Sequence, residues 1–120
     1  AVALARDSNG KEFGLSAKSH LAVGYTKRED RAELHNPQGK YTFILEPANR
    51  LLMNAARLGL KIDPACLYAS TVPTAREQVN LVGAGISTLS IGDMAQARDE
   101  FSIMAMRQLA DAGILKIEHA

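Results

Sequence analysis

The sequence predicts an α+β domain, in which an antiparallel β-sheet with an N-terminal hairpin is covered by a C-terminal helical region. Three observations predict this class. Segments with alternating apolar and polar residues fill most of the chain, a hairpin-type turn lies near its start, and an amphipathic helical pattern comes last. Strands followed by a helix are typical of α+β proteins. The 120 residues predict a single domain, with a hairpin over residues 1–16, sheet strands over 18–90 and a helical region over 93–118.

The N-terminal hairpin is predicted from Asn9-Gly10, which lies between two short segments that contain apolar residues. Both residues tolerate the positive φ angles that tight hairpin turns require. We therefore expect two antiparallel strands over residues 2–7 and 11–16.

Three further strands are expected before Pro47. Residues 20–28 alternate apolar and polar side chains, and a charged turn leads from them into a return strand over residues 31–35. Residues 40–46 have the clearest strand pattern, and Pro47 interrupts the ladder after them.

The segment over residues 48–62 fits two structures. Its composition favours a helix that begins after Pro47, whereas Leu52, Leu58 and Ile62 also fit the alternation of a strand. We predict a strand over much of residues 50–62, because the layout described below requires one.

Two more strands are expected over residues 65–72 and 77–90. The first lies between two prolines. The second contains Gly83 and Gly85, which predict a bend or a bulge.

The last element is the clearest helix of the sequence, over residues 93–112. Asp93-Met-Ala-Gln96 resembles a capping box at its start. Apolar side chains then recur at helical spacing until Ala112-Gly113 end the helix. An apolar tail follows over residues 114–117.

Composition and charge exclude several classes of site. The single cysteine excludes an internal disulfide and a Cys-based zinc site, and three distant histidines form no HExxH motif, so neither metal nor cofactor is expected. The net charge is +1, but residues 1–61 carry ten basic and six acidic side chains and residues 62–120 carry four and seven. Such asymmetry can orient a protein toward a polyanion. No apolar run approaches the ~20 residues that span a bilayer, so no membrane contact is expected.

Two enzyme-like features carry little weight. Gly83-Ala-Gly85 resembles the turn that binds a dinucleotide pyrophosphate, but Thr88 stands where that turn needs a third glycine. Cys66 and His35 are a candidate nucleophile and base, although nothing in the sequence brings them together. Because no catalytic constellation is found, the chain is not expected to be an enzyme.

Polar residues that alternate with apolar neighbours are expected to gather on one face of the sheet. Lysine and arginine neutralise phosphates, and threonine, asparagine and glutamine hydrogen-bond bases and sugars. An ordinary solvated sheet face is the alternative. The candidate RNA-binding residues are His20, Arg28, Lys40, Thr42, Gln78, Asn80 and Thr88.

The order of these elements resembles the coat proteins of single-stranded RNA bacteriophages, the levivirus type. In that family an N-terminal hairpin leads into an antiparallel sheet, and one or two C-terminal helices pack across a partner's sheet. The matching pieces are the hairpin over residues 2–16, the strands over 20–28, 40–46 and 77–90, and the helix over 93–112 with its tail over 114–117.

The resemblance implies a structural coat protein that forms an obligate homodimer with exchanged C-terminal helices. Many dimers would build a closed shell around single-stranded RNA, so the protein would be part of the virion, assembled in the bacterial cytoplasm. Crossing helices of two chains would cover an apolar stripe that one sheet leaves open. The candidate dimer-interface residues are Phe101, Met104, Ala105, Leu109, Ile114 and Leu115.

Two other functions stay open. The first is a small dimeric nucleic-acid-binding regulator, in which residues 48–60 and 93–112 form a helical reader. The second, ranked last, is a small nucleotide-binding enzyme that uses the turn at Gly83-Ala-Gly85.

Overall fold

A computed structural model describes the chain except for residues 13–14, 16, 19, 22–43 and 98. The described residues form a five-stranded sheet with the order β2-β1-β5-β6-β7 and a separate pair, β3-β4. The strands are β1 (Val2–Leu4), β2 (Ala17–Lys18), β3 (His20–Leu21), β4 (Ile44–Leu45), β5 (Cys66–Thr71), β6 (Thr88–Asp93) and β7 (Lys116–His119). The helices are α2 (Pro47–Leu58), α3 (Ala75–Gly83) and α4 (Glu100–Asp111).

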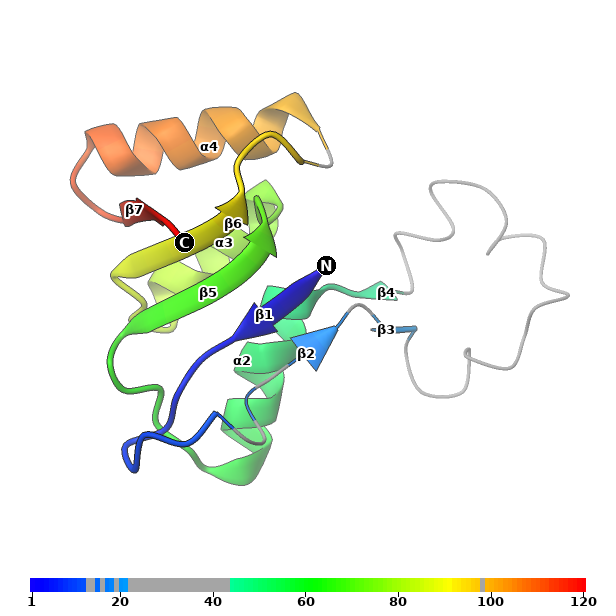
Figure 1. The fold of residues 1–120 in the computed structure, drawn as a ribbon, viewed down its shortest axis with the longest axis vertical. Coiled ribbons are helices and arrows are strands. Elements are labelled where there is room, and N and C mark those ends of the chain that lie inside the picture. Colours follow the sequence, from blue (N-terminus) through cyan, green and yellow to red (C-terminus); the bar gives the residue numbers. More distant parts are fainter. Residues whose placement is uncertain (13–14, 16, 19, 22–43, 98) are drawn as a thin grey trace, which may run out of the picture.

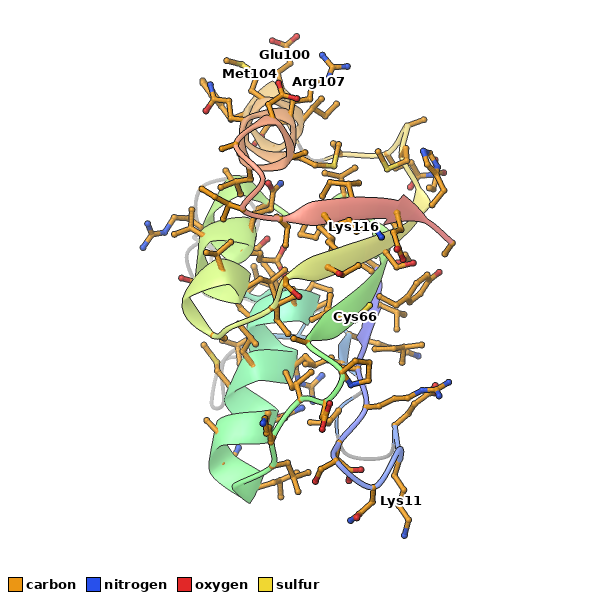
Figure 2. The ribbon with its side chains drawn as sticks, turned by 90° about the vertical axis from the view of Figure 1, so that its left-hand side faces the viewer. Lys11, Cys66, Glu100, Met104, Arg107 and Lys116 are labelled. Atoms are coloured by element: carbon orange, nitrogen blue, oxygen red, sulfur yellow. The ribbon has the colours of Figure 1, made fainter. Side chains whose placement is uncertain are left out.

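The five-stranded sheet is mixed. β1 pairs antiparallel with both β2 and β5, whereas β5, β6 and β7 pair in parallel. α3 connects β5 to β6, and α4 connects β6 to β7, because parallel neighbours need a crossover connection. In Figure 1, α2 and α3 lie behind the sheet and α4 lies beside its β7 edge, in contact with α3 and β7. Figure 2 shows α2 and α3 on one side of the sheet.

The alternation along the central strands determines which sheet face the helices cover. Leu67 and Ala69 of β5 and Leu89 and Ile91 of β6 are buried, whereas the residues between them are partly exposed. The helices add Leu51, Ala55, Leu81 and Met106 to the same core. Because each large apolar side chain contributes about 1.5–3 kcal/mol when buried, this helix-covered face stabilises the fold.

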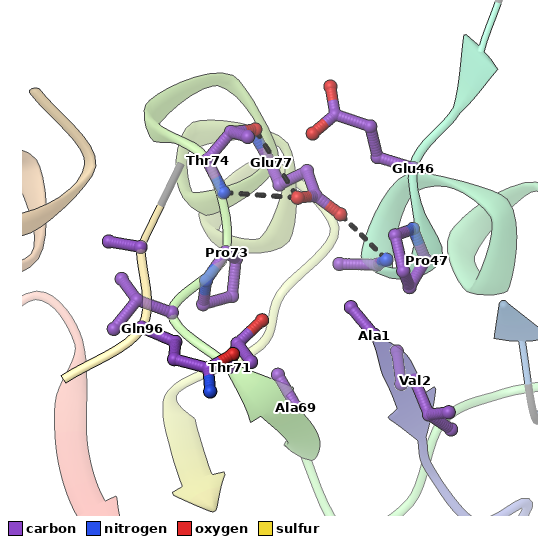
Figure 3. Close-up of a pocket in the computed structure, with 14 residues that line it drawn as sticks. Ala1, Val2, Glu46, Pro47, Ala69, Thr71, Pro73, Thr74, Glu77 and Gln96 are labelled. Carbon is purple, nitrogen blue, oxygen red and sulfur yellow. Dashed lines mark hydrogen bonds between the residues drawn. The ribbon is translucent and has the colours of Figure 1, made fainter. Parts of the chain in front are cut away.

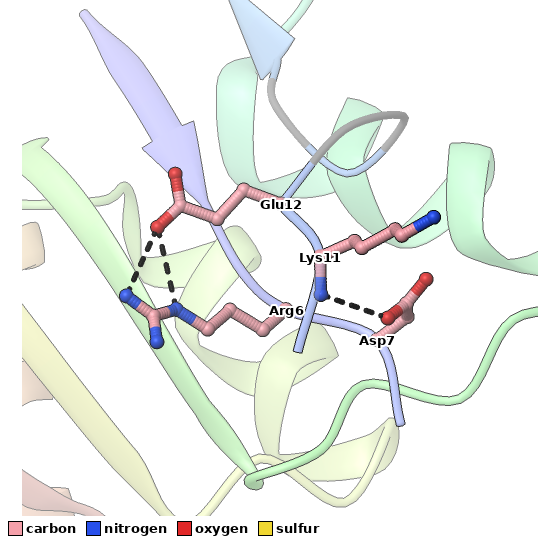
Figure 4. Close-up of polar contacts among 4 residues, drawn as sticks. All are labelled: Arg6, Asp7, Lys11 and Glu12. Carbon is pink, nitrogen blue, oxygen red and sulfur yellow. Dashed lines mark hydrogen bonds and ion pairs between the residues drawn. The ribbon is translucent and has the colours of Figure 1, made fainter. Parts of the chain in front are cut away.

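The N-terminal turn is held by Asp7. Its Oδ1 accepts a hydrogen bond from the N–H of Lys11 at 3.0 Å, and its carbonyl oxygen accepts one from the N–H of Gly10 at 2.9 Å. Gly10 has a φ of 78°, a region that favours glycine. Arg6 and Glu12 form an ion pair across the turn, with 3.2 Å between Nη2 and Oε1 (Figure 4).

The predicted turn at Asn9-Gly10 is therefore present, but the strand after it is not the one expected. β1 pairs with β2, with Ala3 opposite Ala17, and the described residues of the predicted strand, 11, 12 and 15, are not in a strand. The other edge of β1 pairs with β5, so β1 is an inner strand of the larger sheet.

The predicted strand over residues 50–62 is wrong, because α2 spans most of it. Gly59 ends the helix with a φ of 66°. From Ala48 onward, the side chains that α2 buries recur every three or four residues, which is the period of a helix that packs on one side. They are Pro47, Ala48, Leu51 and Ala55.

The predicted strand over residues 77–90 is also wrong. Its first half is α3 and its second half leads into β6. The buried positions of α3 follow helical spacing, but two of the three, Glu77 and Gln78, are polar. For this reason the sequence shows no apolar period of a helix over α3. Gly85, with a φ of 91°, belongs to the turn after α3 rather than to a bend in a strand.

The C-terminal helix is present but begins later than predicted. Asp99 is the N-cap of α4, and Asp93 is the last residue of β6. The apolar tail leads into β7, which pairs in parallel with β6 and places Ile117 opposite Leu89.

The predicted antiparallel sheet with exchanged C-terminal helices is therefore wrong. Three strands of the larger sheet run parallel, and α4 packs on α3 and β7 of its own chain. Periodicity identifies the buried face of a strand but not the direction of its neighbour. The predicted strand over residues 31–35, and most of those over 20–28 and 40–46, lie outside the described residues. No helix in the described part of the chain has the length and apolar character needed to cross a membrane.

Candidate functional site

A cavity of about 250 Å³ lies at the carboxyl end of β5. It is lined by the start of β1, the N-terminal end of α2, the segment that leads from β5 into α3, and residues that follow β6 (Figure 3). In open sheets with parallel strands, ligands bind outside the carboxyl ends of the strands. The cavity therefore occupies the position at which this kind of architecture holds a ligand.

Glu77 joins the N-terminal ends of α2 and α3 beside the cavity (Figure 3), and it is 3% exposed. Its Oε2 accepts hydrogen bonds from the N–H groups of Ala48 at 2.7 Å and Asn49 at 3.3 Å. Its Oε1 accepts from the N–H of Thr74 at 3.0 Å and from the Thr74 hydroxyl at 3.3 Å. A carboxylate offers about four acceptor positions, so these hydrogen bonds use all of them. A negative charge is also favourable at helix N-termini.

Thr74 completes a capping box at the start of α3. Its Oγ1 accepts a hydrogen bond from the N–H of Glu77 at 3.3 Å, while the Glu77 carboxylate accepts from the N–H of Thr74. One turn further, Nδ2 of Asn80 donates to Oδ1 of Asn49 at 2.9 Å. The cavity wall formed by α2 and α3 is therefore cross-linked by hydrogen bonds.

Thr71 and Gln96 line another side of the cavity (Figure 3). Thr71 ends β5, and the carbonyl oxygen of Gln96 accepts a hydrogen bond from the N–H of Val72 at 3.1 Å. The side chains of Thr71 and Gln96 make no hydrogen bond with other described residues. With the carboxylate of Glu46, they supply neutral and acidic polar groups, and no described lining residue is lysine or arginine.

The candidate RNA-binding residues that the structure describes do not lie together on one sheet face. Gln78 lies in α3 and is 0% exposed, where its Nε2 donates to the carbonyl oxygens of Pro73 at 2.9 Å and Ser102 at 2.8 Å. Asn80 is on the same helix, and Thr88 begins β6.

The structure describes one of the four other RNA-binding candidates. His20 is in β3, whereas Arg28, Lys40 and Thr42 lie outside the described residues. RNA contacts by these residues stay an untested prediction.

The candidate dimer-interface residues divide into two groups. Leu115 is buried in the core of its own chain, and Leu109 packs against that core. Phe101, Met104 and Ile114 are 72%, 52% and 50% exposed. Ala105 is partly buried in α4. The three exposed residues alone are available to a partner as large apolar side chains.

Cys66 and the glycine pair lie away from the cavity. Cys66 is on β5, in a second hollow that Arg6 and Tyr68 also line. Burial raises the pKa of the Cys66 thiol, and the charge of Glu118 raises it further, which is the opposite of an activated cysteine. Its proposed partner His35 is outside the described residues. The turn at Gly83-Ala-Gly85 ends α3, whereas the cavity lies at the start of that helix.

Comparison with known proteins gives a structural match only. No protein-family model and no curated protein sequence matches the chain. A dCMP deaminase from the cyanophage S-TIM5, solved in complex with dCMP and dUMP, superimposes with a TM-score of 0.68 at 18% identity, over 99% of this chain and 80% of that one. The apo form of that deaminase gives a TM-score of 0.65 at 16% identity, over 99% and 79% of the two chains.

The chain has the deaminase fold. This match overturns the resemblance to phage coat proteins, and with it the predicted function as a capsid protein and the predicted place in a virion. The expectation that the chain is not an enzyme also rested on the wrong fold, since the structural neighbours are enzymes. The alternative that was ranked last, a small nucleotide-binding enzyme, agrees better with the match, although its proposed glycine turn is not at the cavity.

The described residues that line the cavity do not include the metal-binding residues of zinc deaminases. Those enzymes use an H-x-E…P-C-x-x-C signature, in which histidine and two cysteines hold zinc and the glutamate is the general acid–base. At the two helix ends beside the cavity, this chain reads Glu46-Pro-Ala48 and Pro73-Thr-Ala-Arg-Glu77. Thr74 and Glu77 follow Pro73 with the same spacing that the two cysteines of the signature have after its proline.

The chemistry of these replacements does not suit zinc. All acceptor positions of Glu77 are used within the protein, and within the described ranges no three His, Cys, Asp or Glu residues are placed to hold a metal ion. The whole sequence has one cysteine, so the paired-cysteine half of the signature is missing. The residues at this site therefore do not fit a catalytic zinc ion.

Sequence reasoning missed Glu77 and Thr74, although one local signal was present. Thr74-Ala-Arg-Glu77 has the S/T-x-x-E spacing of a capping box, directly after a proline. Recognising it would have predicted a helix from Ala75 in place of the strand expected over residues 77–90.

Proposed function

We propose that the cavity binds the base and sugar of a pyrimidine deoxynucleotide and that the chain is a small-nucleotide-binding protein. One observation carries this proposal. The cavity lies at the carboxyl end of β5 in a fold shared with a deaminase that was solved with dCMP and dUMP. Its volume of about 250 Å³ is near the lower end of small-molecule sites, which are about 300–1,000 Å³, and suits a nucleoside better than a dinucleotide.

The polar groups of the cavity suit a base better than a phosphate. Helix N-termini commonly bind phosphates through free N–H groups. Here the N–H groups of Ala48, Asn49 and Thr74 already donate hydrogen bonds to the Glu77 carboxylate. The Thr71 hydroxyl and the Gln96 amide can each donate and accept, as the edge of a pyrimidine base requires. We therefore expect the phosphate to point out of the cavity.

Thermal shift and calorimetry with dCMP, dUMP, deoxycytidine and inorganic phosphate test this proposal. A ligand at about 100 times its Kd stabilises the folded state by about 2.7 kcal/mol, so a bound pyrimidine compound should raise Tm measurably, and phosphate alone should not. Gln96→Ala should weaken binding about fivefold, the value of one hydrogen bond near 1 kcal/mol. Gln108→Ala, an exposed glutamine on α4, is the matched control. If none of the pyrimidine compounds shifts Tm, or if both variants lose binding equally, the proposed site is wrong.

Self-association is compatible with the deaminase fold. We propose that it uses the outer side of α4, where Phe101 and Met104 are exposed, and that the partner is a second copy of this chain. Glu100 and Arg107 lie on the same outer part of α4 as Met104 (Figure 2). In a two-fold pair of antiparallel α4 helices, Glu100 of each copy would face Arg107 of the other, so the surface is complementary to itself.

A further inference from the structure

We propose that Glu77 replaces a metal ion as the connection between α2 and α3, so that this deaminase-fold chain folds and keeps its cavity without zinc. In the zinc signature, one segment supplies a histidine and a later segment supplies two cysteines, so the metal ties the two segments together. Here the same two segments are tied by a carboxylate. The inference does not depend on which ligand the cavity binds.

The geometry of the connection supports this replacement. Glu77 belongs to α3, and its Oε2 accepts from the N–H groups of Ala48 and Asn49 at the start of α2, 29 and 28 residues earlier in the chain. The shorter of these hydrogen bonds, at 2.7 Å, is in the range of charge-assisted bonds. The buried carboxylate also lies at the positive ends of two helix dipoles. It thereby contacts both segments, as a metal ion would contact ligands from both.

The local sequence converts a metal-binding turn into a capping turn. Two cysteines with two residues between them would direct two thiolates toward one metal ion. Thr74 and Glu77 have the same spacing but bond to each other's backbone N–H instead, which satisfies donors that a helix start leaves open. No metal is then needed to hold the start of α3.

The first test measures metal dependence in the unaltered protein. After expression in zinc-supplemented medium, mass spectrometry should find less than about 0.1 zinc per chain, and a chelator should leave Tm within about 1 °C, since removing a ligand that is not bound cannot shift stability. Zinc near one per chain, or a Tm that falls with chelator, would overturn the inference.

The second test removes the carboxylate. Glu77→Ala leaves the N–H groups of Ala48, Asn49 and Thr74 without an acceptor, and should lower Tm by about 5–10 °C. Glu77→Gln keeps the shape of the side chain but lacks one acceptor oxygen, so the decrease in Tm should be smaller. Arg76→Ala, which removes an exposed charged side chain from the same first turn of α3, is the matched control and should change Tm by less than about 2 °C.

A local measurement separates the connection from general destabilisation. In Glu77→Gln, hydrogen exchange at the Ala48 and Asn49 amides should accelerate about tenfold more than exchange at the core strands β5 and β6. A uniform acceleration, or a Tm for Glu77→Ala equal to that of Arg76→Ala, would show that Glu77 does not connect the helices.

Discussion

Glu77 and Gln78 are neighbours in the sequence and both are buried, yet each connects α3 to a different element. Glu77 bonds to the start of α2, and Gln78 donates to the carbonyl oxygens of Pro73 and Ser102, the latter in α4. Buried polar side chains need partners of this kind because an unsatisfied group costs about 1–3 kcal/mol. Pattern reasoning placed both residues on a strand, since a sequence does not reveal that a glutamate or glutamine is buried.

The pKa of Cys66 leads to a testable prediction. Burial, and secondarily the Glu118 carboxylate, raise the pKa of the thiol, so less of the reactive thiolate is present at any pH below that pKa. At about pH 8, alkylation by iodoacetamide should therefore be slower than for free cysteine, whose pKa is about 8.5. The rate should rise with pH along a titration curve displaced to higher pH.

Glu118→Gln separates the two causes. Because burial is the larger cause, this variant should move the titration curve only part of the way back toward that of free cysteine. A complete return would mean that the carboxylate, and not burial, controls the thiol. Alkylation of the urea-unfolded protein is the reference for the unperturbed rate.

At the scale of elements, α2 shows how helix signals can lie beneath a strand-like pattern. Of the residues that fit a strand, Ala56 and Leu58 are exposed, whereas Leu51 and Ala55, which fit a helix, are buried. Pro47 at the start and Gly59 after the end follow the usual asymmetry of helix termini. These local signals were correct, and the strand was preferred only because a wrong family layout required it.

The start of α4 gives a prediction at the same scale. Oδ1 of Asp99 accepts hydrogen bonds from the N–H and the hydroxyl of Ser102, both at 2.9 Å. Asp99→Ala should therefore lower the free energy of unfolding by about 0.5–2 kcal/mol, measured by urea denaturation. Asp99→Asn should keep most of the stability because asparagine is also a good N-cap.

Asp111→Asn, at the other end of α4, is the opposite control. It removes a negative charge from the negative end of the helix dipole, so it should raise stability by about 0.3–1 kcal/mol. Equal losses for Asp99→Ala and Asp111→Asn would contradict the assigned cap.

At the scale of the whole molecule, the sheet and its helices bury a core but leave apolar side chains outside it. Phe101 and Met104 of α4 project away from α3 and β7, because the inner positions of the helix are taken by Ser102 and Met106. These two side chains are the apolar part of the α4 surface for which we proposed self-association. The coat-protein interpretation used these residues for exchanged helices, whereas the fold leaves them for a surface contact.

Self-association through α4 should be visible by analytical ultracentrifugation. Each large apolar side chain buried in the contact contributes about 1.5–3 kcal/mol, and Phe101→Ser removes one from each of the two copies, so association should weaken by at least roughly 100-fold. Met53→Ser, at another exposed apolar residue on α2, should leave it unchanged. A parent protein that stays monomeric at micromolar concentration, or a Met53→Ser variant that dissociates to the same degree, would contradict the α4 interface.

The sequence by itself determined features that depend on neighbouring residues. The strand β5 lies within residues 65–72, where a short segment between two prolines predicted it, and an amphipathic C-terminal helix was expected where α4 lies. The turn at Asn9-Gly10 and the lack of paired cysteines were also readable directly. Each of these features follows from the spacing of apolar residues, from the residues that favour a turn, or from the number of residues of one type.

Only the tertiary structure decided the parallel pairing of β5, β6 and β7, the cavity at the carboxyl end of β5, and the role of Glu77. The physical reason is that periodicity reports that one side of an element is buried, but not which element covers it. The Glu77 carboxylate and the Ala48 N–H are 29 residues apart in the chain, and nothing local to either one indicates the other. Their contact exists because two helices pack on the same face of one sheet with their N-terminal ends together.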